Sequence, residues 1–386
     1  MRVMVMHPSA ELYGSDRVLL ESVAAYTERD VPVTVVLASD GPLVDELRRI
    51  GAEVEVTDLP VLRKSMLSPV GLVRLAGRSI VWVFRGRRLV RRVRPSVVYV
   101  STVTIPIANV IARLSRIPLV VHVHEAEDSA GRLARFALSA PLHLAHRIVY
   151  NSGFSQRTVE RMFPALAARS EIVLNGVTAP RTVHAPRPTL EGGIRVVYVG
   201  RLSARKGPDV VVEAIAQLPE TLPASLSLVG AVYPGYEWFE EALRERVGAL
   251  GLEERVAFEG FVDDAYPMIS AADVMVVSSR VDEPFGNTAV EAMLAARPVV
   301  VSDTSGLREA AAGYESARFV APGDASAIAS AIESIATGWS DVREAAERDA
   351  LVATERHSTA SYREHLRTAV SRALQGRRSR GVEAAS

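Results

Sequence analysis

The chain has 386 residues and no cysteine, with 45 basic and 45 acidic side chains. The lack of cysteine excludes disulfides, thiolate nucleophiles and cysteine-based zinc sites. Apolar residues make up 48% of the sequence and charged residues 23%. This composition predicts a globular protein that is long enough for two α/β domains.

The neutral net charge hides two halves of opposite sign. Residues 1–186 hold 24 basic and 16 acidic side chains, and residues 187–386 hold 21 and 29, which gives net charges of +8 and −8. This asymmetry indicates different partners for the two halves, or attraction between them. Nucleic acid is not among the expected partners.

Neither the N-terminus nor the longest uncharged stretch has the character of a membrane-inserted segment. Only four apolar residues separate Arg2 from His7, which is too few for the apolar region of a secretory signal. The uncharged stretch Pro95–Ala112 contains too many polar residues for a membrane span. We therefore expect a cytoplasmic protein.

Short β-branched runs alternate with helical stretches, which predicts repeated βαβ units and parallel sheets. In the first half we expect strands near Arg2–Met6, Val33–Ala38, Glu53–Val56, Val97–Val100, Leu119–Val123, Arg147–Tyr150 and Glu171–Leu174. A proline-rich connection at Ala185–Leu190 precedes a second series at Ile194–Val199, Ser225–Val229, Arg255–Phe258, Asp273–Ser278, Pro298–Ser302 and Arg318–Val320.

The sequence therefore predicts an α/β protein with domains at residues 1–188 and 189–358. A helix at about 359–374 is expected to cross back onto the first domain, and residues 375–386 are expected to form a disordered tail. In parallel sheets, ligands bind at the carboxyl ends of the strands. The loops that follow the strands are therefore expected to carry the ligand-binding residues.

The first such loop is the segment Gly200–Asp209, in which a glycine loop follows a strand and Pro208 suits the first position of a helix. Backbone N–H groups at such a junction bind phosphate, and Arg201 and Lys206 add two cations. Only Lys64 and Lys206 are lysines among the 45 basic residues, so an ammonium here indicates a specific contact. A solvated basic loop is the alternative.

Two carboxylates frame a second motif, which follows the strand expected at Asp273–Ser278. Glu283 belongs to a loop stiffened by proline, and Glu291 is expected in the first turn of a helix. The backbone amides between them can hold a sugar hydroxyl or a phosphate; they belong to Phe285, Gly286, Asn287 and Thr288. For Glu291 the alternative is a structural role, in which it forms a helix-capping box with Thr288. For Glu283 the alternative is a solvated loop carboxylate.

Together the two motifs resemble the glycosyltransferases of family 4, which have the GT-B fold. The Gly200–Lys206 loop is followed about 80 residues later by Glu283 and Glu291, with seven residues between the two glutamates. Other segments extend the resemblance over about residues 2–372; they are Tyr13–Ser15, Val121–Glu125, Val149–Ser152, Leu174–Val177 and Phe258–Phe261. The resemblance implies two Rossmann-like domains whose parallel sheets face a central cleft.

The resemblance also implies roles for individual residues. Arg201 and Lys206 would bind the donor diphosphate. Glu291 would bind the ribose hydroxyls and Glu283 the transferred sugar. His124 would hydrogen-bond the donor sugar near the reacting centre.

Two residues in the first half, Gly14 and His122, bear on how the resemblance is interpreted. Gly14 would let the first loop approach a phosphate or the acceptor, but the family commonly has two glycines here, whereas this chain has Gly14-Ser15. Ser15 is therefore expected to cap the helix that follows. His122 competes with His124 for the role above. We expect their side chains to point to opposite faces of a strand, with His124 reaching the cleft.

The sequence thus predicts a glycosyltransferase that moves a sugar from a nucleoside-diphosphate sugar to an acceptor hydroxyl. The resemblance implies retention of configuration at the anomeric carbon. No Asp-x-Asp or clustered His/Glu set has metal-ligand spacing, so no metal and no other cofactor are expected. The alternatives are a GT-B epimerase or phosphorylase, and a non-catalytic protein that binds a nucleotide sugar or a glycan.

Twelve basic residues and no acidic one lie between Leu59 and His124. The apolar residues 80–84 adjoin a cluster of arginines, which is the composition of a basic amphipathic helix; the cluster is Arg85, Arg87, Arg88, Arg91 and Arg92. One interpretation is that residues 63–94 bind an anionic membrane at its inner face, with a lipid-linked or cell-envelope glycan as acceptor. The other is a helix packed on the first sheet, with a soluble acceptor.

Overall fold

Two separate parallel sheets organise the chain in the computed structural model, which describes residues 1–62, 69–125 and 131–383. The chain forms two units. The first comprises Met1–Gly176 together with the C-terminal segment from Thr359, and the second comprises Val177–Ser358.

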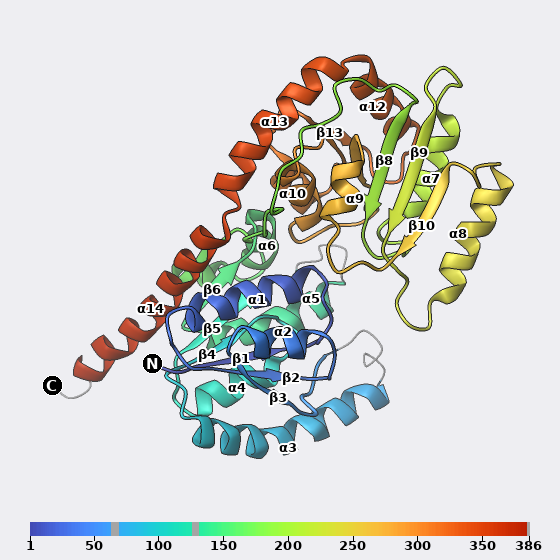
Figure 1. The fold of residues 1–386 in the computed structure, drawn as a ribbon. Coiled ribbons are helices and arrows are strands. Elements are labelled where there is room, and N and C mark those ends of the chain that lie inside the picture. Colours follow the sequence, from blue (N-terminus) through green and yellow to red (C-terminus); the bar gives the residue numbers. More distant parts are fainter. Residues whose placement is uncertain (63–68, 126–130, 384–386) are drawn as a thin grey trace. The chain divides into compact units, whose positions relative to one another are not determined.

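The sheet of the first unit has seven parallel strands in the order β3-β2-β1-β4-β5-β6-β7 (Figure 1). Its strand order reverses between β1 and β4, which is the point where ligands bind in open sheets of this kind. The strands are β1 (Val3–His7), β2 (Val33–Leu37), β3 (Glu53–Val56), β4 (Val97–Val100), β5 (Leu119–Val123), β6 (Arg147–Tyr150) and β7 (Ser170–Ile172).

Side chains alternate along the buried strands of this sheet, so both of its faces are apolar. Helices cover both faces. On β1, Met4 and Met6 pack with Trp82 on one face, whereas Val3 and Val5 pack on the other. The Met4 face carries α3 (Pro69–Val93) and α4 (Pro106–Leu114). The Val3 face carries α1 (Gly14–Thr27), α2 (Leu43–Arg49) and α14 (Thr359–Glu383). The remaining elements are α5 (Arg132–Ser139), η2 (Ala140–Leu144), α6 (Gly153–Glu160) and η3 (Pro164–Arg169).

The sheet of the second unit has six parallel strands in the order β10-β9-β8-β11-β12-β13. Its order reverses between β8 and β11, so the loops after these two strands flank the expected ligand position. The strands are β8 (Ile194–Val199), β9 (Ala224–Val229), β10 (Val256–Gly260), β11 (Val274–Val277), β12 (Val299–Ser302) and β13 (Ala317–Val320).

Seven helices accompany this sheet among the described residues, and α7 and α12 supply much of its apolar core. Val210 and Ile215 of α7 and Ile328 and Ile332 of α12 are fully buried in that core. The helices are α7 (Pro208–Gln217), α8 (Glu237–Ala249), α9 (Tyr266–Ala271), α10 (Asn287–Leu294), α11 (Ser305–Ala311), α12 (Ala325–Thr337) and α13 (Trp339–Arg356).

These elements confirm the α/β architecture with two Rossmann-like parallel sheets. Each expected strand is present, and its ends differ from the expected ones by no more than two residues. The first unit, however, ends at Gly176 rather than at residue 188. The connection after it packs on the second unit, where Arg187 pairs with the buried carboxylate of Asp273 and the carbonyl of His184 accepts a hydrogen bond from Arg297.

The last helix, α14, packs on α1 in the first unit. The hydroxyls of Tyr362 and Ser22 lie 2.6 Å apart, and Arg363 forms an ion pair with Glu21 at 2.6 Å. The helix continues to Glu383, so residues 375–383 are helical where the sequence analysis expects a disordered tail. This stretch lacks proline and continues the backbone ladder of the helix before it.

Candidate functional site

The glycine loop after β8 is held against the end of β11. Gly207 caps α7 with φ of 66°, a left-handed conformation that favours glycine. A Cβ at this position would lie 2.4 Å from the carbonyl oxygen of Ser278. The Ser278 hydroxyl in turn lies 3.0 and 2.8 Å from the carbonyl oxygens of Lys206 and Gly207. These contacts fix the backbone at the N-terminus of α7, where an anion is favoured.

Lys206 and Glu283, two of the residues selected from the sequence, are in direct contact. The Lys206 Nζ lies 2.8 Å from the Glu283 Oε1, and Arg205 Nη1 lies 3.7 Å from the same oxygen. The Ser279 hydroxyl also donates to this oxygen at 2.8 Å. Glu283 is buried, with 7% of its surface exposed, so it is not the solvated carboxylate of the alternative reading.

The charge state of Glu283 follows from these neighbours. Burial by itself raises the pKa of its carboxyl, but the charges of Lys206 and Arg205 and the hydrogen bonds outweigh burial and lower that pKa. Glu283 is therefore an ionised acceptor at neutral pH. Arg205 and Ser279 were not selected from the sequence, although Arg205 directly precedes Lys206 and Ser279 lies in the loop after β11.

Arg201 has a different environment from Lys206. Its guanidinium lies 5.0 Å from the ring centroid of Tyr233, and its backbone carbonyl accepts a hydrogen bond from Tyr198 at 2.8 Å. Stacking on an aromatic ring orients a guanidinium while leaving its N–H edges able to donate. Tyr233, in the loop after β9, has no signal in the sequence that would select it.

The loop before α10 is tightly packed. Phe285 is buried and its ring contacts that of His357 at 5.7 Å between centroids, so its side chain anchors the loop and only its backbone can meet a ligand. Gly306 of α11 approaches so closely that a Cβ there would lie 2.0 Å from the carbonyl oxygen of Glu283. Any larger residue at 306 would displace the Glu283 backbone.

Helix α10 begins at Asn287, and Gly286 is its N-cap. Thr288 is therefore the second helical residue and cannot form the capping box with Glu291 that the sequence analysis offered as an alternative. Glu291 lies one turn after Asn287 and three residues after Thr288, so the three half-buried side chains share one face of the helix. Helix α10 follows β11, which is one of the two strands between which the strand order of the second sheet reverses.

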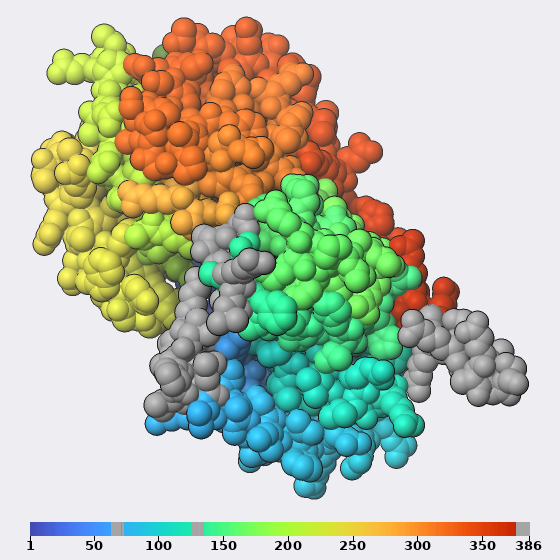
Figure 2. Space-filling model, turned by 180° about the vertical axis from the view of Figure 1, so that it is seen from behind, coloured from blue at the N-terminus to red at the C-terminus, as the bar shows by residue number. Residues whose placement is uncertain are grey.

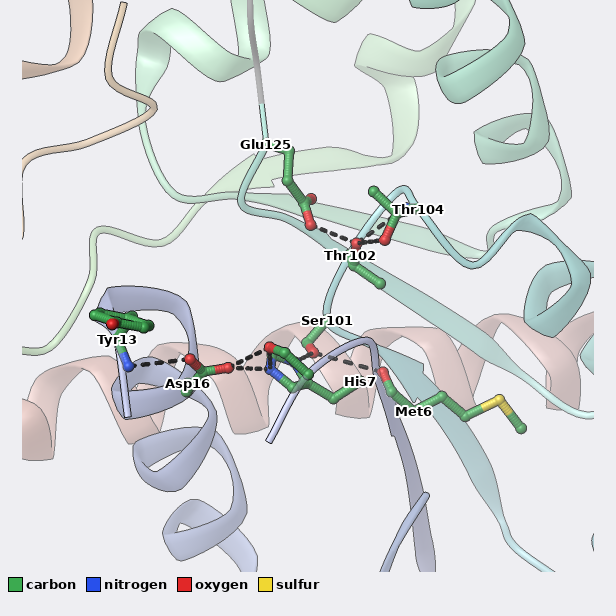
Figure 3. A network of polar contacts seen from close by, with 9 residues as sticks. Met6, His7, Tyr13, Asp16, Ser101, Thr102, Thr104 and Glu125 are labelled. Atoms are coloured by element: carbon green, nitrogen blue, oxygen red, sulfur yellow. Dashed lines mark hydrogen bonds and ion pairs between the residues drawn. The ribbon is translucent and has the colours of Figure 1, made fainter. Parts of the chain in front are cut away.

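In the first unit, polar side chains gather at the carboxyl ends of β1, β4 and β5, which are neighbours in the sheet (Figure 3). The buried imidazole of His7 lies between two partners, with its Nδ1 2.6 Å from the Ser101 hydroxyl and its Nε2 2.8 Å from Asp16 Oδ1. The other Asp16 oxygen accepts the backbone N–H of Tyr13 at 3.0 Å. This network, which sequence reasoning missed, fixes the loop that leads to the exposed Gly14.

The same contacts correct the expectation for Ser15. Helix α1 begins at Gly14 with Tyr13 as its N-cap, which places Ser15 inside the first turn, where it is exposed. Asp16 supplies the side chain that accepts the Tyr13 amide, as an acidic residue at the third helical position does in a capping box.

His122 and His124 lie on the same face of β5 and the residue after it, with ring centroids 3.9 Å apart. The expectation of opposite faces is therefore wrong, because residues two apart along a strand share a face. His122 is fully buried and its Nδ1 lies 2.6 Å from the Tyr99 hydroxyl, which gives it a structural role.

His124 directly follows β5, at the carboxyl end of the strand, and is 7% exposed. Burial, followed by the nearby charge of His7, lowers the pKa of His124 to about 3, so its imidazole is neutral at neutral pH. Its Nε2 is buried and has no hydrogen-bond partner within the described part of the chain. An orphaned ring nitrogen of this kind can accept or donate one bond to a ligand.

Glu125 follows His124 and was not selected from the sequence. Its carboxylate accepts a hydrogen bond from the Thr102 hydroxyl (Figure 3). It accepts another from the backbone N–H of Val103 at 3.2 Å. Burial raises the pKa of Glu125, an effect that these hydrogen bonds only partly offset. The carboxylate therefore ties the end of β4 to the end of β5.

The described residues contain neither a metal-ligand cluster nor a helix suited to crossing a membrane. In residues 1–62, 69–125 and 131–383, no group of three or more His, Asp or Glu side chains is placed to hold a metal ion. In the same part of the chain, no helix combines the length and the apolar character that a membrane crossing requires.

Two family models match consecutive parts of the chain. The model described as "Glycosyl transferase 4-like domain" matches residues 13–176, and the model described as "Glycosyl transferases group 1" matches residues 182–350. Together they cover most of both units. The chain therefore belongs to the family-4-like glycosyltransferases.

Individual relatives share between 27% and 39% sequence identity with the chain over different parts of its length. Mannosylfructose-phosphate synthase of Agrobacterium fabrum (strain C58) is 39% identical over 156 residues, which are 38% of this chain and 33% of that protein. The chain thus spans only a third of the length of this relative. Alpha-D-kanosaminyltransferase of Streptomyces kanamyceticus is 27% identical over 326 residues, which are 76% of this chain and 82% of that protein.

A solved structure shows the same fold. Anabaena HepE in complex with UDP and glucose is similar with a TM-score of 0.81 at 22% identity, over 96% of this chain and 99% of that chain. This likeness confirms the GT-B fold that the sequence predicts.

Proposed function

We propose that the protein transfers a sugar from a nucleoside-diphosphate sugar to an acceptor hydroxyl, with retention of anomeric configuration and without a metal ion. The observation that carries this proposal is the contact between Lys206 and Glu283 where the strand order of the second sheet reverses. In this contact an ammonium that would meet a diphosphate lies beside a carboxylate that would accept from sugar hydroxyls. HepE, a protein of the same fold, was solved with UDP and glucose, which supports this class of donor.

In this proposal the donor diphosphate lies at the N-terminus of α7. The helix dipole and the cations of Arg201 and Lys206 meet its charge. As the bond to the sugar breaks, negative charge grows on the departing phosphate, so fixed cations stabilise the transition state more than the bound donor. These cations would do the work that a metal ion does in other transferases.

The sugar and ribose contacts follow from the same loops. Glu283 is ionised and would accept hydrogen bonds from hydroxyls of the transferred sugar. Glu291 would accept from the ribose hydroxyls, and the backbone of residues 285–288 would contact the sugar or the phosphate. His124 is neutral at neutral pH, so it would act through a hydrogen bond rather than through a positive charge.

Retention is proposed to arise from attack on the face that the diphosphate leaves. The acceptor oxygen would form its bond to the anomeric carbon while the departing phosphate oxygen takes the acceptor proton. No protein base is then required.

Proton NMR of the first product tests this stereochemistry. An anomeric signal of the donor's own configuration is expected, and an inverted signal would contradict the mechanism. A chelator should leave the rate unchanged; a rate that is abolished by chelation and restored by Mg²⁺ or Mn²⁺ would contradict metal independence.

Product analysis without an acceptor separates the alternatives. An epimerase would release free sugar nucleotide of altered configuration, and a phosphorylase would use inorganic phosphate as acceptor. A non-catalytic binding protein would shift in melting temperature with a nucleotide sugar but form no product.

The surface of α3 supports an acceptor at a membrane. One face of this helix packs on the first sheet through Trp82 and Leu89, whereas Ile80 and Phe84 are 64% and 73% exposed. The segment that contains α3, coloured blue, lies at the surface of the first unit in Figure 2. Exposed arginines adjoin these apolar residues; they are Arg85, Arg88, Arg91 and Arg92. Residues 63–68 of the proposed membrane segment lie outside the described residues.

Helix α3 packs on the first sheet, as the second interpretation expects, and it also presents an exposed basic and apolar face. We propose that this face, comprising Ile80, Phe84, Arg85, Arg88 and Arg91, binds the anionic inner surface of a membrane reversibly. Exposed apolar side chains beside arginines are the combination that holds a helix in the headgroup region. The acceptor would then be a lipid-linked or cell-envelope glycan.

A further inference from the structure

A cavity of about 650 Å³ lies in the first unit, away from the site described above. Its walls come from the end of α4, from the segment between η2 and β6, from η3 and from α14. The first three of these segments precede β5, β6 and β7, respectively. Since all strands of the sheet are parallel, the cavity lies at their amino ends, whereas His7, Ser101 and His124 lie at the carboxyl ends.

Positive charge dominates the lining of this cavity. Five arginines contribute to it; they are Arg113, Arg116, Arg147, Arg169 and Arg372. Among the described residues, Arg372 alone of these five pairs with a carboxylate, that of Glu171, at 2.6 Å. Within the described part of the chain, Arg113, Arg116 and Arg147 form no ion pair. Four of the five guanidinium groups therefore have no carboxylate partner among the described residues.

One of these arginines also has an unused donor. Arg169 Nη1 donates to the carbonyl of Ala145 at 3.2 Å, but its Nε is buried and has no acceptor among the described residues. A buried N–H without an acceptor is costly unless a ligand or water supplies one. An anion in the cavity would offset the unpaired positive charge of its lining.

The rest of the lining is apolar or aromatic. Ile117, Leu144 and the ring of His143 contribute to the wall, and the His143 ring packs edge-on against Phe163 at 4.9 Å between centroids. The volume falls within the range of pockets that hold small organic ligands, which is about 300–1,000 Å³, and it exceeds what a single phosphate needs. The cavity therefore suits an anionic group attached to a compact organic body.

We propose that this cavity, lined by Arg113, Arg116, Arg147, Arg169 and Arg372, is a second binding site for a ligand that carries two or more phosphate groups. Arginine forks match phosphate oxygens in pairs, and each phosphate brings up to two negative charges against the unmatched guanidinium groups. The site is separate from the proposed donor site. It also contacts α14, which begins immediately after the last residue of the second unit.

Hydrogen-exchange mass spectrometry of the full chain with inorganic pyrophosphate as probe tests the site. Pyrophosphate is expected to slow exchange in residues 113–118 and 143–147. Its dissociation constant at these segments should rise about tenfold or more in the double variant Arg113→Gln/Arg116→Gln, because two phosphate contacts are removed. The matched control is Arg48→Gln/Arg49→Gln on α2, which removes the same charge from the same unit outside the cavity and should keep the protection.

The source of the phosphate is distinguished by a second arm with vesicles that contain phosphatidic acid. Protection by pyrophosphate points to a free phosphorylated molecule, whereas protection only by the vesicles points to a lipid headgroup. In either case the protection must be lost in the Arg113→Gln/Arg116→Gln variant. If neither probe slows exchange in these segments, or if the variant is protected like the wild type, the site does not exist. Protection near Lys206 reports on the donor site and leaves this result unaffected.

Discussion

The Lys206 ammonium lies 2.8 Å from the Glu283 carboxylate, although the two residues follow different strands, β8 and β11. These strands are neighbours at the reversal of strand order, so the topology brings the two loops together. Each charge fixes the other, since Lys206 keeps Glu283 ionised and Glu283 holds the ammonium. A ligand with both a diphosphate and hydroxyls would meet the two ends of this ion pair.

Replacing Glu283 by Gln should slow turnover more than it weakens donor binding. The amide keeps the shape of the side chain but loses the charge that hydrogen-bonds the sugar in the transition state, so kcat should fall about 10²-fold. The donor Kd should change by less than about threefold, because Lys206 is retained. Steady-state rates with saturating donor measure this, and the exposed Glu259→Gln is the control. A normal kcat would remove Glu283 from the reacting centre.

Glu291→Ala should have the opposite pattern. Loss of a charged hydrogen-bond partner costs about 1.5–3 kcal/mol, so donor affinity should fall at least about tenfold while kcat stays nearly constant, as for a contact of equal strength in ground and transition states. Calorimetric binding and a melting curve decide; a large drop in Tm with unchanged donor affinity would make Glu291 structural.

The neutral state of His124 predicts a dependence of stability on pH. Its pKa is about 3 in the folded protein and about 6.5 in the unfolded chain. Between these values the unfolded chain binds more protons, so the free energy of unfolding should fall as the pH falls from about 6.5 to about 3, by up to about 1.4 kcal/mol per pH unit. Urea unfolding at pH 7 and pH 5 should show a smaller loss for His124→Gln than for the wild type. Equal losses would contradict the burial argument, and the exposed His184→Gln serves as control.

Liposome co-sedimentation tests the basic face of α3. The protein should bind vesicles that contain anionic lipid and detach as salt rises, because each arginine near the surface contributes about 1 kcal/mol. Arg85→Ser/Arg88→Ser/Arg91→Ser and Phe84→Ser should each weaken binding, whereas Leu351→Ser, an exposed apolar residue on α13 of the second unit, should not. Protein that stays in the supernatant at low salt would favour a soluble acceptor.

The sequence was sufficient to predict the strands of both sheets and their parallel pairing. Continuous valine runs such as Val196–Val199 and Val274–Val277 leave few alternatives to a buried parallel strand. The positions of Lys206 and Glu283 in the second unit were predictable for the same reason. Gly207, Lys206 and Glu283 lie in short loops directly after such strands, and the topology fixes where those loops meet.

The first unit's network could not be predicted, because its members are far apart in the sequence and are ordinary residues singly. His7, Asp16 and Ser101 become a network only when β1 and β4 pair. The face shared by His122 and His124 was, by contrast, deducible from strand geometry alone. The boundary at Gly176 depends on ion pairs such as Arg187 with Asp273, which no local pattern reveals.

The central claim, that the loop at Lys206 binds a nucleoside-diphosphate sugar, is tested most directly by calorimetric titration of a panel of such donors. At least one donor should bind the wild type and be turned over with an acceptor. Its affinity should fall by about 10²-fold or more in Lys206→Ala, because a diphosphate charge loses its ammonium partner. The control Arg244→Ala, on α8 of the second unit, should bind as the wild type does. Near-normal donor affinity and rate in Lys206→Ala would contradict the account.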